Sequence, residues 1–228
     1  MDYLVYASLQ EGRDAEAAAV IQDLRGMARL TAGDFKVGYA ATAMPVRYAV
    51  ERKRWDDATR CAAPEGAPPQ VAALAAWARA LGYARSGNAT AAQAELQSLQ
   101  RLTDQLRASG NQYWAGQVQI QTKEASSWIA LAVRKPEEAL ALMKSAADEE
   151  DAVEKLPVTP GPVVPAREQL GDMLAQLGRP AVALAEYENA LKDSPGRRGA
   201  LEGALSSARA AGLKSKSAYY EAAIRKLD

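Results

Sequence analysis

The stretch "GDMLAQLGRPAVALAEYENALKDSP", residues 171–195, decides how this chain folds. Apolar residues recur at helical spacing on both sides of "LGRP", and glycine close to proline marks a turn between two helices. Small residues stand at Gly171, Ala183 and Ala190, where a larger side chain would hold two crossing helices apart. Pro195 has no N–H and disfavours helix at the residue before it, so it ends the second helix. The stretch therefore predicts an antiparallel helix pair packed closely through small residues.

The composition of the whole chain narrows its function before any motif is considered. Its 228 residues carry 28 basic and 28 acidic side chains, whereas proteins that bind a nucleic-acid backbone usually show a basic excess or face. Histidine is absent, which removes the residue most used for acid–base catalysis near neutral pH. Cys61 is the only cysteine, so we expect no disulfide within the chain, no cysteine metal cluster and an inert, buried thiol. We therefore expect a non-catalytic protein with no cofactor, no metal and no nucleic-acid partner.

Glycine and proline punctuation divides the rest of the chain into further helix pairs. No stretch shows a convincing strand pattern, so the expected fold class is all-α. Turns within pairs are predicted near Gly12, at residues 53–54, 86–88 and 134–136, and near Gly212, with longer breaks at 31–38, 63–69 and 109–111. The expected organisation is one continuous domain: four helix pairs in residues 1–156, a proline-rich connector at 157–165, and two further pairs in residues 166–228.

The fifth pair resembles a tetratricopeptide repeat, whose 34-residue pattern is W-x2-L-G-x2-Y, then A-x3-F, then P. Laid on residues 164–197, the pattern is met by Leu170, Gly171, Ala183, Tyr187, Ala190 and Pro195. The departures are Arg167, where tryptophan is common, and Leu174, where tyrosine is. The other pairs match less fully, so the resemblance covers nearly the whole chain but is most specific here. It implies a right-handed superhelix, an α-solenoid of antiparallel helix pairs whose first helices line a concave face.

A concave face of this kind implies a scaffold that binds a protein or peptide in its groove. Amide and aromatic side chains there suit hydrogen bonding to a peptide backbone with aromatic anchoring. Counting from the turns places the following residues on or beside that face: Tyr6, Arg47, Trp77, Tyr113, Trp114, Gln117, Gln121, Glu124, Glu168 and Asp172. For Trp77 and Trp114 we prefer the alternative that they are core residues between helix pairs.

Acidic residues in the fifth pair exclude one known use of such repeats. Adaptors of this family that clamp a free carboxylate have lysine and asparagine where this chain has Glu168 and Asp172. These two acids, spaced i and i+4 on one helix face, favour a cationic or amide-rich ligand instead. Glu124, Glu168 and Asp172 are also the candidate residues of a carboxylate-based hydrolase. We prefer the alternative that these acids are solvated or form salt bridges, with Arg167 nearby. The acid run "DEEDAVEK", 148–155, lacks the spacing of a calcium loop and is expected to be a solvated helix end.

The connector "LPVTPGPVVP", residues 156–165, holds four prolines and is therefore stiff and extended. We prefer a rigid spacer, and the alternative is a lid over the groove with Thr159 and Arg167 facing the ligand. Two other functions stay open: a small-ligand or regulatory sensor that uses the same groove with Arg47 and the aromatics, and a structural module that forms homodimers through exposed terminal pairs.

Three segments are similar to the C-terminal half of longer bacterial tetratricopeptide proteins with no assigned activity: "DYLVYASLQ", "YWAGQVQIQ" and "PVTPGPVVPAREQLGDML". This resemblance implies that the chain is a fragment. No apolar run approaches the roughly 20 residues needed to span a bilayer, and the N-terminus lacks the features of a signal peptide. We therefore expect no membrane span and, by default, a cytoplasmic location, unless the chain belongs to a longer exported protein.

Overall fold

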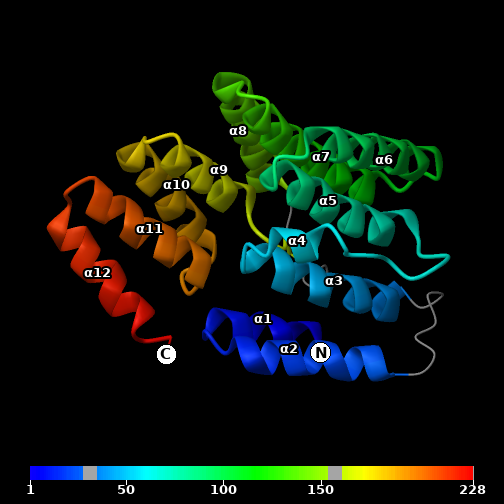
Figure 1. Ribbon diagram of the computed structural model, residues 1–228, viewed down its shortest axis with the longest axis horizontal. Coiled ribbons are helices and arrows are strands. Elements are labelled where there is room, and N and C mark those ends of the chain that lie inside the picture. The colour runs from blue at the N-terminus through cyan, green and yellow to red at the C-terminus, as the bar shows by residue number, and fades with distance from the viewer. Residues whose placement is uncertain (28–34, 154–160, 228) are drawn as a thin grey trace.

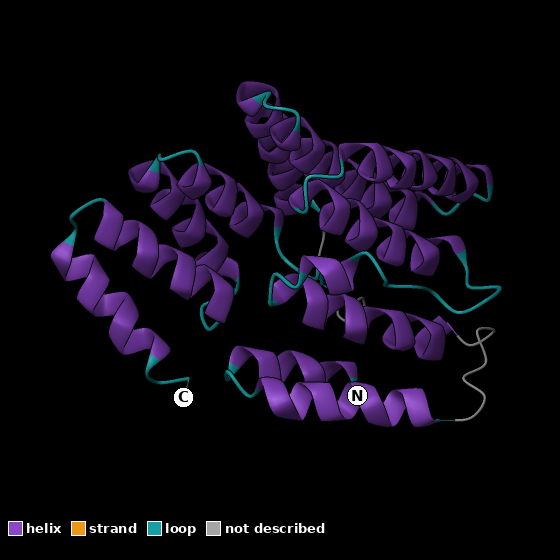
Figure 2. Cartoon of the chain, viewed as in Figure 1, coloured by secondary structure: helices purple, strands orange, loops and turns teal. Residues whose placement is uncertain are grey.

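The computed structural model describes residues 1–27, 35–153 and 161–227, and all regular structure in these ranges is helical (Figures 1 and 2). This confirms the all-α prediction. The helices are α1 (Asp2–Gln10), α2 (Asp14–Gly26), α3 (Phe35–Glu51), α4 (Trp55–Ala58), α5 (Pro69–Arg85), α6 (Ala89–Ala108), α7 (Gln112–Ala132), α8 (Pro136–Ala152), α9 (Ala166–Gln176), α10 (Pro180–Asp193), α11 (Arg198–Ala210) and α12 (Lys214–Ile224).

The helices pack mainly against their neighbours in the chain, as an array of helix pairs. Within the array the odd-numbered helices also contact one another, α1 with α3, α3 with α5, α5 with α7, and α9 with α11. α9 packs mainly against α8 and α10. We call the surface of α3, α5 and α7 on which residues 161–163 lie the inner face. Each even-numbered helix packs against its odd-numbered neighbours in the chain, and α8 lies at the upper edge of the array in Figure 1.

The fifth pair has the close packing that its small residues predict. Tyr187 of α10 lies between the pairs, and a Cβ added to Gly171 of α9 would come within 2.8 Å of its ring. A Cβ at Gly203 of α11 would come within 2.3 Å of the same ring. Ala183 and Ala190 are buried as well. The glycines therefore admit one tyrosine ring between α9, α10 and α11, which is why larger side chains are absent there.

Turns between the helices fall where the punctuation predicts them. Gly178 ends α9 with a φ of +72°, a backbone conformation that glycine adopts without strain, and Pro180 then occupies the first turn of α10. In the second pair Lys53 takes a φ of 52° between α3 and the four-residue α4. The link expected at residues 31–38 ends earlier than predicted, because α3 already begins at Phe35, and residues 28–34 lie outside the described residues.

One contact joins the two ends of the array. The backbone N–H of Arg198 in α11 donates to the Gln10 side-chain oxygen at 2.9 Å, and the Arg198 Nε donates to the Gln10 carbonyl at 2.8 Å. In Figure 1 the first helix pair accordingly lies below α3 and beside the lower end of α11. The helix array is therefore closed by a contact between α1 and α11. None of the described helices is long and apolar enough to cross a membrane.

Candidate functional site

A segment of the chain itself, residues 161–165, lies against the inner face and bends at Val163 and Val164. The Val163 carbonyl accepts hydrogen bonds from Arg47 Nη1 of α3 at 3.3 Å and from Arg197 Nη2 at 3.1 Å. The Val164 carbonyl accepts one from Gln169 Nε2 at 3.1 Å. Only 4% of Val163 and 7% of Val164 is exposed. The segment is therefore anchored by both its main-chain oxygens and its two valine side chains.

A small cavity of about 30 Å³ lies beside this segment, where residues 161–163 meet α3, α5 and α7. It has room for about one water molecule. The Gln121 Oε1 is buried and makes no hydrogen bond within the described structure. Burial raises the pKa of Tyr39 to about 12, so its hydroxyl stays protonated. The lining is thus polar and aromatic: Tyr39, Gln70, Leu74, Trp114, Gln117, Val118 and Gln121, closed by the segment.

The donors that hold the segment belong to a buried charge cluster formed by Arg47, Glu51, Glu168 and Arg197. Glu51 accepts from Arg47 at 3.2 Å and from Arg197 at 3.5 Å, and Arg197 also pairs with Glu168. No side chain of the four is more than 8% exposed. Burial raises the pKa of Glu168, and the Arg197 guanidinium opposes that shift. The charge cluster links α3 to α9 and to the residue before α11, with the Val163 carbonyl between its two arginines.

Glu124 of α7 is a second buried acid, only 2% exposed, in different surroundings. No lysine or arginine among the described residues pairs with it, and burial raises its pKa well above the usual range. The nearby Glu150 carboxylate raises the pKa further, while the Gln169 amide and the Trp77 indole act in the opposite direction. The surroundings of Glu124 therefore favour its protonated, neutral form.

Polar contacts connect the second helix pair to the fifth. Lys53 pairs with Asp172 at 2.8 Å, and the Tyr187 hydroxyl donates to the same carboxylate at 2.7 Å. The Arg85 guanidinium lies 4.2 Å from the Trp128 ring centre and 5.2 Å from that of Trp55. Arg85 also donates to the Gln176 side chain of α9 at 2.7 Å, so this residue joins the end of α5 to both α7 and α9.

The structure brings several of the sequence-predicted residues together. Trp114, Gln117 and Gln121 line the small cavity, and Tyr113 packs edge-on against Trp114 with ring centres 5.5 Å apart. The Arg47 guanidinium lies over the Tyr6 ring at 5.2 Å. Trp77 is 2% exposed and lies in the hydrophobic core, which is the alternative that we prefer for it from the sequence.

Other predictions for this face need correction. Arg167 turns away from the segment and pairs with Asp148, Asp151 and Glu186 of α8 and α10, because these acids surround the first turn of α9. The acid run of α8 is therefore partly engaged rather than simply solvated. Thr159, and with it residues 157–160 of the connector, lies outside the described residues.

The partners expected for Glu168 and Asp172 also differ. Arg167 pairs with neither in the described structure, since Glu168 faces Arg197 and Asp172 faces Lys53. Sequence reasoning missed Arg197 because its contact with Glu51 spans 146 positions. The available signal was "PGRRG" at 195–199, where basic residues precede a helix whose positive dipole end disfavours them unless acids lie near.

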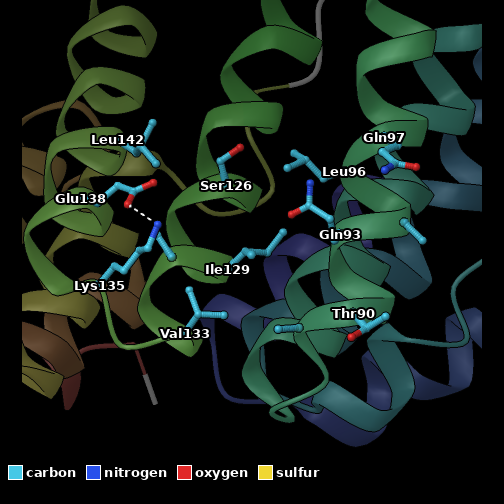
Figure 3. Close-up of a pocket in the computed structure, with 13 residues that line it drawn as sticks. Thr90, Gln93, Leu96, Gln97, Ser126, Ile129, Val133, Lys135, Glu138 and Leu142 are labelled. Carbon is cyan, nitrogen blue, oxygen red and sulfur yellow. Dashed lines mark ion pairs between the residues drawn. The ribbon is translucent and has the colours of Figure 1, made fainter.

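A larger, open groove lies on the outside of the array, between α6, α7 and α8 (Figure 3). Its volume is about 800 Å³. Lys135 and Glu138 form an ion pair at 3.1 Å in this groove, and Leu96 and Ile129 are among the apolar residues that line it (Figure 3). Gln93 and Gln97 of α6 face it from one side. No pattern in the sequence predicts this outer groove.

Cys61 is buried as expected. Burial raises the pKa of its thiol to about 11, which keeps it protonated and unreactive near neutral pH. Comparison of the chain with protein-family models and with curated proteins gives no match.

Proposed function

We propose that this chain is a non-catalytic, tetratricopeptide-like scaffold, a right-handed α-solenoid that binds a protein or peptide on its inner face. The observation that carries the proposal is the chain's own segment 161–165, which lies on that face with two main-chain carbonyls bound by buried donors. Binding through main-chain carbonyls, with side-chain pockets beside them, is a general mode of peptide recognition.

The donors of the inner face support this role because they are fixed before any ligand arrives. Arg47 and Arg197 are oriented by Glu51 and Glu168, and Gln169 accepts from the Trp128 indole at 2.9 Å while it donates to Val164. Ligand groups then meet donors whose side-chain freedom is already lost, which lowers the entropy that binding must overcome.

The positions of the three candidate acids favour binding over hydrolysis. Glu124 is buried with a raised pKa, Glu168 pairs with Arg197, and Asp172 bonds Lys53 and Tyr187. A hydrolase of the carboxylate type needs two acids facing each other across a substrate-sized gap. The small cavity, about 30 Å³, also lies far below the roughly 300–1,000 Å³ of small-ligand pockets, which favours a scaffold over a sensor on this face.

Self-association is a second candidate, because large apolar side chains are exposed on both end pairs. Tyr3 and Leu4 of α1 are 78% and 59% exposed, and Tyr219 of α12 is 67% exposed. If these patches join two copies, sedimentation should show a dimer that dissociates on dilution and on Tyr219→Ser substitution.

Panning of a displayed random-peptide library tests the scaffold proposal. Peptides selected on the wild-type chain are measured by fluorescence polarisation against the double variant Gln117→Ala, Gln121→Ala, which changes the inner face. The matched control is Gln93→Ala, Gln97→Ala, an equally spaced pair of glutamines in the outer groove. We expect at least about tenfold weaker binding for the inner pair, since buried polar partners are lost, and no change for the outer pair.

The opposite pattern would overturn the proposal. If the outer pair weakens binding and the inner pair does not, the peptides occupy the groove between α6 and α8. If no peptide is selected on the wild-type chain or on any folded variant of residues 161–165, the chain is not a peptide scaffold. Circular dichroism of both variants establishes that each is folded.

A further inference from the structure

We infer that residues 161–165 act as an internal ligand that occupies the partner site, and that the partner is a peptide carrying an aliphatic pair between prolines. This inference rests on the proposed function and names both the class of partner and the way its access is controlled. The geometry that points to it is the segment "GPVVP" itself, held on the inner face by contacts of the kind a peptide in trans would use.

The first step is the chemistry that the segment offers. Pro162 and Pro165 have no N–H, so the segment presents few donors, and every described donor to it comes from the inner face or α9. Its exposed end, Gly161 and Pro162, faces solvent, whereas Val163 and Val164 are buried. The recognised features are thus two aliphatic side chains and two adjacent carbonyls in a backbone that bends at Val163 and Val164 between two prolines.

The second step is that the site holds hydrogen-bond donors that suit either the internal segment or a partner peptide. Arg47 and Arg197 converge on a single carbonyl, and Gln169 binds the next one. All three donors are at most 5% exposed, and Glu51 and Glu168 balance the two positive charges. If the segment leaves, these buried donors lose their acceptors, so the site favours a replacement with carbonyls in the same places.

The third step is competition. A segment tethered in the same chain has a high effective concentration at its site, so it outcompetes a free peptide of equal intrinsic affinity. The apparent affinity of a partner then falls in proportion to the fraction of molecules whose site is open. Partner binding is therefore weak in the closed chain and strengthens when the internal segment is loosened.

The experiment loosens the segment and leaves its donors unchanged. The variant is Val163→Gly, Val164→Gly, and the probe is a fluorescent capped peptide, Gly-Pro-Val-Val-Pro-Ala, measured by polarisation. Removal of both buried valines should strengthen binding of the probe at least about tenfold relative to wild type. A probe with both valines replaced by aspartate should bind neither protein. Adding Gln169→Leu to the variant should abolish the gain, because the second carbonyl loses its donor.

A milder variant keeps the inference testable if the double variant does not fold. Pro162 is exposed, so Pro162→Gly removes no buried contact and only makes the segment more flexible. It should strengthen probe binding about two- to fivefold. Circular dichroism and urea denaturation show whether each variant is folded at the measuring temperature.

The outcomes separate this inference from the scaffold proposal. If the probe binds wild type and variants equally, the segment does not compete, and internal occupancy is overturned while the scaffold stands. If library peptides bind and the probe binds none of the proteins, the proposed partner class is wrong and the scaffold again stands. If neither library peptides nor the probe bind any folded variant, both proposals fail.

Discussion

Glu168 and Glu124 are both buried on inner helices, yet their surroundings are opposite. Glu168 belongs to the charge cluster and faces Arg197, whereas no cation among the described residues pairs with Glu124, whose near neighbour Glu150 is another acid. Burial raises the pKa of both, but at Glu168 a guanidinium opposes the shift. Burial alone therefore does not decide the charge of an acid, because a fixed partner decides it. The acid near the contact between α1 and α11 is part of an ionic cluster, whereas the acid of α7 is in surroundings that favour its protonated form.

The largest expected effect comes from removing the charge that Arg197 faces. Glu168→Gln leaves the buried Arg197 guanidinium with the more distant Glu51 as its remaining acidic partner, so the free energy of unfolding should fall by about 3 kcal/mol. Urea denaturation measures the loss. In the double variant with Arg197→Gln the total loss should be smaller than the sum of the two single losses. Strict additivity would show that the pair does not interact.

A smaller effect should follow when the carboxylate is displaced without changing its charge. A Cβ at Gly199 would lie 2.4 Å from Glu168 Oε1, so Gly199→Ala pushes the carboxylate away from Arg197. We expect a loss of about 1–3 kcal/mol in thermal or urea denaturation. Gly116→Ala is the control, because nothing lies within 4 Å of a Cβ there on α7, and it should stabilise by about 0.5–1 kcal/mol. Equal effects of both substitutions would contradict the geometry of the charge cluster.

The smallest effect has the opposite sign and concerns Glu124. Its pKa is higher in the folded than in the unfolded chain, so stability present at acid pH is lost as the pH rises through the raised value. Glu124→Gln removes this loss. We expect the variant to match wild type near about pH 4 and to be more stable by about 1–2 kcal/mol near about pH 8. Parallel stability curves for the two proteins would show that Glu124 is not held neutral.

Much of the fold could be predicted because its signals are local. The turn at "LGRP", the small residues that admit Tyr187 and the break at Lys53 are all encoded within a few residues of where they act. The site was less predictable. Arg47 was assigned to the inner face by its spacing from the turns, but its burial depends on Glu51 and on residues 161–165, which lie more than a hundred positions away. Helical periodicity carries no information about which distant charge a buried charge meets.

The contact between Gln10 and Arg198 has a consequence for cooperativity. In an open helical array each pair contacts only its neighbours, so the ends fray and unfolding can proceed pair by pair. Here the two hydrogen bonds between α1 and α11 span 188 positions and supply an end-to-end interaction. Amide exchange in the first pair should then slow or quicken together with exchange in α11, as one unit. Joining residues so far apart also raises the mean sequence separation of contacts, which predicts that the ends meet late in folding.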